Sequence, residues 1–347
     1  MTITHSLTHS LNMKSLEQCL SVVEKSSLCK KKKLKRTSLR EFITHTYLVL
    51  LGVRSGFLVD CFSLDATSLH ALLELVLSTL IRLNKSKGSV SGSVSECVSG
   101  SVSGSVSGSV SECVSGRDHD FSRVVVVQLP TDDFLLLAPA VFVQCREREC
   151  GVLHNALLVD ISGHTPTVVS AIDAQEVVNH LSELRDIILT ACDTALATTT
   201  SPSHGPCAHI DMLLLEPDTT VVGYECVAGW LLGYECVYNC ASKCGGGYQQ
   251  SLSMLPLSKV SISVAVQWKD VHVATVKEYT VPLCVLTLCE ECTSTGTART
   301  CTCVTTQQFN EMVSSEFEGM KSSLDGEPLL QGFSMETAEV SYSSLAF

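Results

Sequence analysis

Apolar residues recur at helical spacing from residue 69 to residue 83, and this pattern predicts a long helix. Glu74, Ser78 and Arg82 occupy the opposite, polar face, and Asp65 or Ser68 can cap the first turn. The apolar positions are Leu69, Leu72, Leu73, Val76, Leu80 and Leu83. One apolar stripe and one polar stripe are typical of a helix that packs one face on a core.

A second helix is predicted from residue 173 onward. Asp173 is followed three residues later by Glu176, the spacing of a capping box. Its apolar stripe is Val177, Leu181, Leu184, Ile188 and Ala191.

Short apolar runs bounded by turn residues predict strands between and around these helices. Turns are expected at 55–56, at 130–133 and at Lys269-Asp270, where the flanking runs form a hairpin. The predicted strands are 47–52, 56–62, 124–129, 134–144, 153–161, 209–215, 260–268 and 271–282. Two main helices with these strands predict an α+β fold with a mixed or mostly antiparallel sheet.

Low-complexity segments interrupt this pattern and define the expected organisation. A GSVS repeat at 88–116 lacks large side chains, so we expect a flexible linker; a translated tandem DNA repeat or an erroneous gene model would give the same sequence. GYECV occurs at 223–227 and 233–237, within an irregular Cys-rich insertion. The expected parts are a disordered head 1–40, a strand–strand–helix piece 41–87, the linker 88–116, an α+β core 117–308 with the insertion 218–252, and a disordered tail 309–347.

Charge is distributed unevenly along the 347 residues, whose formal net charge is −12. Residues 1–40 carry a net +7, and the tail from 309 to 347 carries a net −6. The basic density lies in one run, Lys30, Lys31, Lys32, Lys33, Lys35 and Arg36. Such a run fits the acidic groove of a nuclear import receptor or binds phosphates, and it equally suits a solvated charge run in a mobile arm. We therefore expect a nuclear or cytoplasmic protein, with the nucleus favoured.

The hydropathy and the cysteine residues of the sequence indicate in which cellular compartment the protein is expected. No run approaches the roughly 18 apolar residues of a membrane span, and the first residues do not resemble a secretory signal. The 18 cysteines are therefore expected to be thiols in a reducing compartment.

Two cysteine clusters are candidate metal sites. Cys289, Cys292, Cys301 and Cys303 place two thiolate pairs on adjacent turns, which can surround zinc, although the second pair has one intervening residue instead of two. A surface loop rich in Thr and Cys is the competing interpretation. The second cluster spans residues 226–244, and the GYECV echo explains two of its four cysteines without metal chemistry. No cofactor other than this possible zinc is expected.

Motifs of common enzyme classes are missing from the sequence. There is no GxxxxGK[ST], no HExxH, no GxSxG, and no GxGxxG that opens a helix after a strand. Nucleic-acid contact has no support outside the basic head, because aromatic and basic residues do not interleave. We therefore expect a protein that is not an enzyme and that binds other proteins in a multi-subunit complex.

The acidic tail carries isolated apolar residues that suit partner docking. They are Phe309, Met312, Phe317, Leu329, Leu330 and Phe333. Apolar anchors in an acidic background often fold onto a partner, whereas a plain solvating tail is the competing interpretation.

The element order over about residues 123–215 (three strands, a capped helix and a buried strand) resembles the transducer domain of topoisomerase VI B-type subunits, and also longin-like adaptor modules. The first resemblance implies a degenerate B-type subunit, without a nucleotide-binding domain, that bridges a DNA-cleaving partner in meiotic break formation. The leading interpretation is a non-enzymatic scaffold that binds partners through its α+β domain and tail. The alternatives are this bridging subunit and a zinc-stabilised protein.

Overall fold

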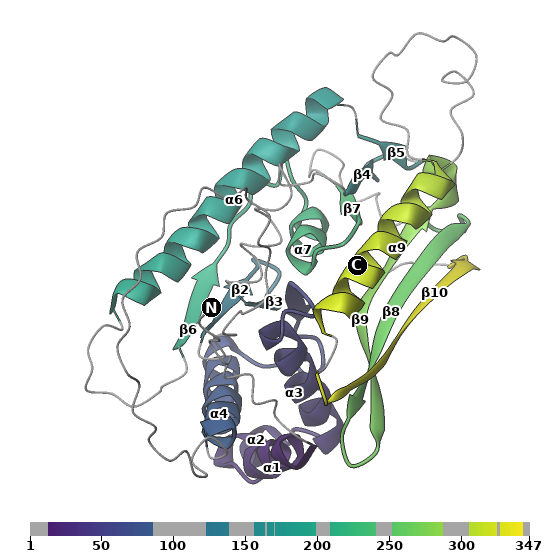
Figure 1. Ribbon diagram of the computed structural model, residues 1–347. Coiled ribbons are helices and arrows are strands. Elements are labelled where there is room, and N and C mark those ends of the chain that lie inside the picture. Colours follow the sequence, from purple (N-terminus) through teal and green to yellow (C-terminus); the bar gives the residue numbers. More distant parts are fainter. Residues whose placement is uncertain are drawn as a thin grey trace, which may run out of the picture.

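The valine run at 124–127 forms β2, an inner strand of a four-stranded sheet (Figure 1). The strands lie in the order β1 (Gly56–Leu58), β3 (Phe134–Leu137), β2 (Arg123–Gln128) and β6 (His209–Leu214). β2 pairs antiparallel with β3 and parallel with β6. Because successive side chains alternate between faces, Val124 and Val126 enter one hydrophobic core, and Val125 and Val127 enter another.

The structure is a computed structural model. It describes residues 13–85, 123–138, 156–163, 165–169, 171–198, 209–240, 252–286, 305–324 and 327–342. The GSVS segment 88–116 lies outside these residues.

Helices cover both faces of the four-stranded sheet. Those that contribute to the first core are α1 (Met13–Glu24), α2 (Ser27–Lys32), α3 (Arg36–Leu50) and α4 (Ala66–Lys85). The second core contains α6 (Ala171–Thr198) and α7 (Tyr224–Leu232), and α6 runs along β6 in Figure 1. Each core therefore belongs to one face of the sheet.

Two three-stranded sheets complete the fold. In the smaller one, β4 (Leu157–Asp160) lies between β5 (Thr167–Val168) and β7 (Cys236–Asn239). The larger one is antiparallel and places β8 (Leu257–Gln267) between β9 (Val271–Pro282) and β10 (Leu330–Val340). The short 3₁₀ helix η3 (Leu283–Val285) follows β9, and α9 (Thr306–Ser323) lies beside this sheet in Figure 1. The predicted α+β class, with mixed and antiparallel sheets, is confirmed.

The two strongly periodic helices and the hairpin are confirmed as well. Asp65 caps α4, accepting a hydrogen bond from the backbone N–H of Ser68 at 2.9 Å. α6 begins at Ala171, two residues before the predicted cap Asp173. The turn between β8 and β9 contains the predicted Lys269 and Asp270, and also Trp268 before them.

The predicted strand at 47–52 is wrong, because α3 runs to Leu50. Residues 42–50 of this helix are all buried. A helix that is buried on every side loses the apolar and polar alternation that distinguishes it from a buried strand. The neighbouring strand at 56–62 is reduced to the three residues of β1.

The basic head and the acidic tail also differ from the prediction, since both contain folded elements. In α1 the residues Leu16, Cys19, Leu20 and Val23 are buried at helical spacing, a pattern that the high charge of this region obscures. Just before the tail, Thr305 and Gln308 form a capping box that begins α9, and this helix continues into the tail as far as Ser323. Tyr47 donates a hydrogen bond to Glu327 at 2.9 Å, which ties the segment before β10 to α3.

The insertion at 218–252 is ordered over much of its length. The first GYECV copy begins α7, whereas the second leads into β7 after Gly233 ends the helix. Cys226, Trp230 and Cys236 are buried. Tertiary contacts therefore decide the conformation of an identical pentapeptide.

Among the described residues, one helix is long and apolar enough to cross a membrane. It is the 66–83 part of α4, and half of this window is buried inside the protein. A core helix passes the same test, so this is weak evidence for a span.

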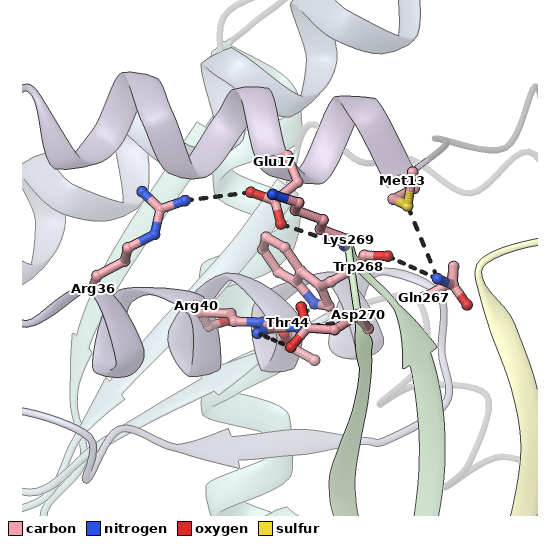
Figure 2. A network of polar contacts seen from close by, with 9 residues as sticks. All are labelled: Met13, Glu17, Arg36, Arg40, Thr44, Gln267, Trp268, Lys269 and Asp270. Carbon is pink, nitrogen blue, oxygen red and sulfur yellow. Dashed lines mark hydrogen bonds and ion pairs between the residues drawn. The ribbon is translucent and has the colours of Figure 1, made fainter.

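A clamp of polar contacts holds the N-terminal helices to the β8–β9 hairpin (Figure 2). The buried indole N–H of Trp268 donates to the hydroxyl of Thr44 at 3.1 Å, and this hydroxyl donates to the Arg40 carbonyl at 2.8 Å. The Arg40 guanidinium pairs with Asp270 at 3.1 Å and lies 5.0 Å from the centre of the Trp268 ring. Elements more than 220 residues apart in sequence are thereby joined.

Removal of the Thr44 hydroxyl should destabilise the fold, because it leaves the buried indole N–H without its acceptor. We expect Thr44→Val to lower the free energy of unfolding by about 1–3 kcal/mol. Urea denaturation followed by circular dichroism measures this change.

Thr46→Val is the matched control on the same helix. Thr46 is fully buried, and its hydroxyl has no hydrogen-bond partner among the described residues. This substitution should cost nothing or stabilise the protein. Equal losses in the two variants would contradict the role of the Trp268–Thr44 bond.

Candidate functional site

A buried lysine on β9 is the centre of a polar cluster in the interior of the protein. Only 6% of the Lys277 side chain is exposed. The register between β8 and β9 shifts at this point, so that Ile262 pairs with Lys277 but Ser263 pairs with Thr275. Val276 is therefore an extra residue, and this bulge turns Lys277 to the same face as the buried Ile262.

Three acceptors from two other elements surround the Lys277 ammonium group. It donates to the carbonyl oxygen of Gly233 at 2.5 Å, to Oε1 of Glu235 at 2.9 Å, and to Oε1 of Glu316 on α9. Tyr279 lies beside this group, and burial together with the Glu235 carboxylate raises the pKa of its phenol. We call Lys277, Glu235, Glu316 and Tyr279 the lysine cluster.

The geometry of the lysine cluster favours a structural role for Lys277. An ammonium group has three N–H donors, and here each has an acceptor. A lysine nucleophile must reach a substrate, whereas only 6% of the Lys277 side chain is exposed. The cluster joins β9, the turn between α7 and β7, and α9.

The turn that supplies two of these acceptors requires glycine at 233. Gly233 has a φ of +72°, and a Cβ there would lie 2.6 Å from the Ser55 hydroxyl oxygen. Ser55 in turn donates to the carbonyl of Leu231 at 3.2 Å. Glycine thus permits both the left-handed end of α7 and the close approach of Ser55.

A second buried pair, Arg54 and His45, lies between α3 and β1. Arg54 donates through Nε to the Gly56 carbonyl at 2.7 Å, and its Nη1 lies 2.7 Å from Nδ1 of His45. Burial, the charge of Arg54 and that of His272 lower the pKa of His45 to about 3. The imidazole is therefore neutral at pH 7 and accepts the Arg54 hydrogen bond. Burial lowers the pKa of Arg54 to about 10, which leaves it charged.

Four cysteine thiols that lie buried or half-buried in the fold have pKa values that make them unreactive. Burial raises the pKa of Cys19 and of Cys61 to about 12, and it raises those of Cys226 and Cys236 further. A neutral thiol is a poor nucleophile and a poor metal ligand, so these cysteines act as small core residues.

The structure places the basic run on a folded surface. Lys30, Lys31 and Lys32 form the last turn of α2, Lys33 follows it in the left-handed conformation, and Lys35 and Arg36 begin α3. Lys32 pairs with Asp65 at 2.8 Å, and Arg36 pairs with Glu17 and Glu24. Lys30, Lys31, Lys33 and Lys35 are exposed and make no ion pair with described residues. We call these four the basic cluster. The predicted nuclear targeting stays a prediction, and a receptor that reads an extended chain must first unwind α2.

The tail residues that are predicted to dock a partner contact the chain's own core, and their docking to a partner stays a prediction. Phe309 and Leu329 are buried, and the Phe309 ring meets the Tyr279 ring edge-on at 6.4 Å between centroids. Met312, Phe317, Leu330 and Phe333 are half-buried and pack on the first core. These side chains are therefore engaged within this chain.

The predicted zinc ligands Cys289, Cys292, Cys301 and Cys303 lie outside the described residues, so the zinc hypothesis stays a prediction. Within the described ranges, no three His, Cys, Asp or Glu side chains group as ligands for a metal ion. Cys244 of the second cluster also lies outside these ranges.

Sequence reasoning missed the lysine cluster, although one signal was present. Buried positions on β9 change from even numbers, Ala274 and Val276, to odd numbers, Tyr279 and Val281. Such a change of phase indicates a bulge, and a lysine at the change is a candidate buried cation. The role of Glu235 as an acceptor for Lys277 could not be found in this way, because Glu235 lies in the second GYECV copy, which was interpreted as a product of duplication.

A shallow depression of about 740 Å³ lies along the outer face of α9. Its described lining is polar: Thr306, Gln307, Asn310, Glu311, Ser314, Ser315 and Glu318. This lining holds no nucleophile and base in contact, so we assign it no chemistry.

The fold and these clusters define an α+β protein whose interior ionic groups join its elements. A family model described as "Domain of unknown function (DUF4504)" matches residues 24–324, and the chain belongs to this family. The matched range includes the lysine cluster and the basic cluster, and it ends before β10. No curated protein and no solved structure matches the chain. The resemblance to topoisomerase VI B-type subunits therefore stays a prediction.

Loss of the Lys277 charge should destabilise the protein strongly, because Glu235 then keeps a buried charge without its partner. We expect Lys277→Met to lower the free energy of unfolding by about 3–5 kcal/mol, and the added Glu235→Gln change to recover part of the loss. Urea titration of both variants measures this difference.

Lys259→Met provides the control for the lysine cluster. Lys259 pairs with Glu278 at 2.8 Å on the surface, where such a pair contributes about 0–1 kcal/mol. A Lys277→Met variant that is no less stable than Lys259→Met would refute the role of the buried triad.

His45 should make the fold sensitive to acid. Its pKa is about 3 in the folded chain and 6.5 when unfolded, so the unfolded state binds more protons between these values. Stability from this residue is complete above pH 6.5 and falls as the pH drops toward 3, by about 2 kcal/mol between pH 7 and pH 5.

Unfolding free energies at pH 7 and pH 5 test this sensitivity in the wild type and in His45→Gln. The variant cannot bind this proton, so its stability should change less between the two pH values. Equal changes in the two proteins would show that His45 does not control the acid response.

Proposed function

We propose that this protein is a non-enzymatic scaffold or adaptor that binds other proteins, and that the basic cluster is one of its binding surfaces. The observation that carries this proposal is a group of four exposed lysines without ion-pair partners among the described residues, on a protein of net charge −12. A local positive surface on an acidic protein attracts acidic partners and disfavours basic ones.

The state of the interior ionic groups supports a binding role. Lys277 uses its three donors within the chain, and Arg54 is bonded to His45 and to a carbonyl. These groups stabilise the fold, whereas the four lysines of the basic cluster make no ion pair within the described ranges and are available for a ligand.

The basic cluster lies on a supported surface. α2 is anchored by buried Cys29, and ion pairs hold Lys32, which lies within the run, and Arg36, which ends it. Because the folded helices already hold these lysines in place, binding does not have the entropy cost of ordering a disordered arm. The tip of the β8–β9 hairpin lies at the same end of the molecule in Figure 1, and β9 begins with the exposed Val271 and Val273. A partner segment that combines acidic and apolar residues fits this end.

A fluorescent peptide of alternating glutamate and leucine tests the proposal by anisotropy against the full chain. We expect Lys31→Gln/Lys33→Gln to weaken binding about fivefold to tenfold, because two charge contacts are lost. Raising the salt concentration should weaken wild-type binding and reduce this difference.

The matched control removes the same number of charges elsewhere. Lys259→Gln/Lys321→Gln acts on lysines that pair with Glu278 and Glu318, and it should leave the affinity unchanged. A wild type that binds the peptide no more tightly than Lys31→Gln/Lys33→Gln would refute the basic cluster as a binding surface.

A further inference from the structure

The edge of β8 holds a strand that is bound mainly through its backbone. β10 pairs antiparallel with β8 from Leu330 to Val340, yet none of its eleven residues is buried. By contrast, β8 alternates buried and half-buried residues along its length. We propose that β10 exchanges between two copies of this chain, so that the β10 of one copy pairs with the β8 of the other.

Because β10 is little buried, its release from β8 costs little free energy. Hydrophobic stabilisation scales with the apolar area removed from water, and the apolar side chains by which this strand packs on the first core, such as Phe333 and Met335, are only half-buried. Hydrogen bonds to an edge strand are replaced by hydrogen bonds to water on opening. Elements with exposed backbone bonds and little buried area belong to the part of a fold that opens first.

A hinge lies near the start of β10, close to the residue that anchors it. Leu329 is buried, and its carbonyl accepts from the Gln267 N–H at 2.8 Å. Three residues later Gly332 has a φ of +78°, and a Cβ at this position would meet no described atom within 4 Å. The register with β8 shifts between Leu330 and Phe333. The chain can therefore change direction at Gly332 while Leu329 stays in place.

Release of β10 exposes the edge of β8, to which another strand can pair. Val260, Ile262 and Val264 of β8 are buried, and they face Thr337, Met335 and Phe333 of β10. Without β10, a row of backbone N–H and C=O groups on this edge of β8 is left unpaired.

A second copy of this chain is the occupant that fits this edge. Its own β10 brings the same register, the same Phe333 and Met335 contacts, and the same end contact from the Met254 N–H to the Tyr342 carbonyl at 2.8 Å. Exchange of an identical element between protomers is a low-cost route to a dimer. β10 also lies beyond the range that the family model matches, which ends at 324. This inference does not depend on the basic cluster.

Isotope mixing of the full chain tests the exchange. Ser263 and Ser334 are register partners on the outer face of the sheet, so Ser263→Cys/Ser334→Cys places two thiols side by side. Equal amounts of unlabelled and ¹⁵N-labelled variant are incubated together at high concentration and linked with a short bismaleimide. Mass spectrometry then identifies the linked peptides. The wild type, treated in the same way, gives the background from native thiols.

Links within one chain join peptides of the same isotope and confirm the register in the same sample. Exchange produces mixed links, whose share rises from background to about half of all 263–334 links when every chain is swapped. A sample in which 263–334 links form, but mixed links stay at background, would overturn the proposal. Mixed links that disappear on dilution of the mixture before linking would support it, because dimers dissociate at low concentration.

Discussion

The position of Lys277 is the constraint on which the C-terminal half of this fold depends. A charge inside a protein must be surrounded by acceptors, and the acceptors here come from the α7–β7 turn and from α9. Three features therefore serve to surround this charge with acceptors: the bulge in β9, the left-handed Gly233 and the placement of Glu316. Apolar contacts alone would allow α9 several orientations on the sheet, whereas a triad of this kind accepts few.

The elements that sequence reasoning predicted correctly are those with one buried face. In α4 and in the β8–β9 hairpin, polar residues mark the solvent side, so the period of the pattern is visible. α3 was mistaken for a strand because its C-terminal half is buried on all sides. The acidic composition of the tail indicated disorder, although the Thr305–Gln308 capping box just before it is the signal of a helix that begins at Thr306.

The candidate sites show a different limit of sequence reasoning. The lysines of the basic run are visible in the sequence, but only the structure separates Lys32 and Arg36, which are paired, from the four that have no such partner among the described residues. The lysine cluster joins residues 233, 235, 277 and 316, whose separation in the chain carries no spacing rule. One copy of GYECV supplies two of its acceptors, so a segment that reads as a repeat became part of the interior.

The two tryptophans lie in different cores. Trp268 belongs to the core shared by the N-terminal helices and the larger sheet, and Trp230 belongs to the core beneath α6. Both side chains are almost completely buried. Each core therefore carries its own intrinsic fluorophore, and replacing one tryptophan at a time would let the loosening of either half be recorded separately by emission wavelength.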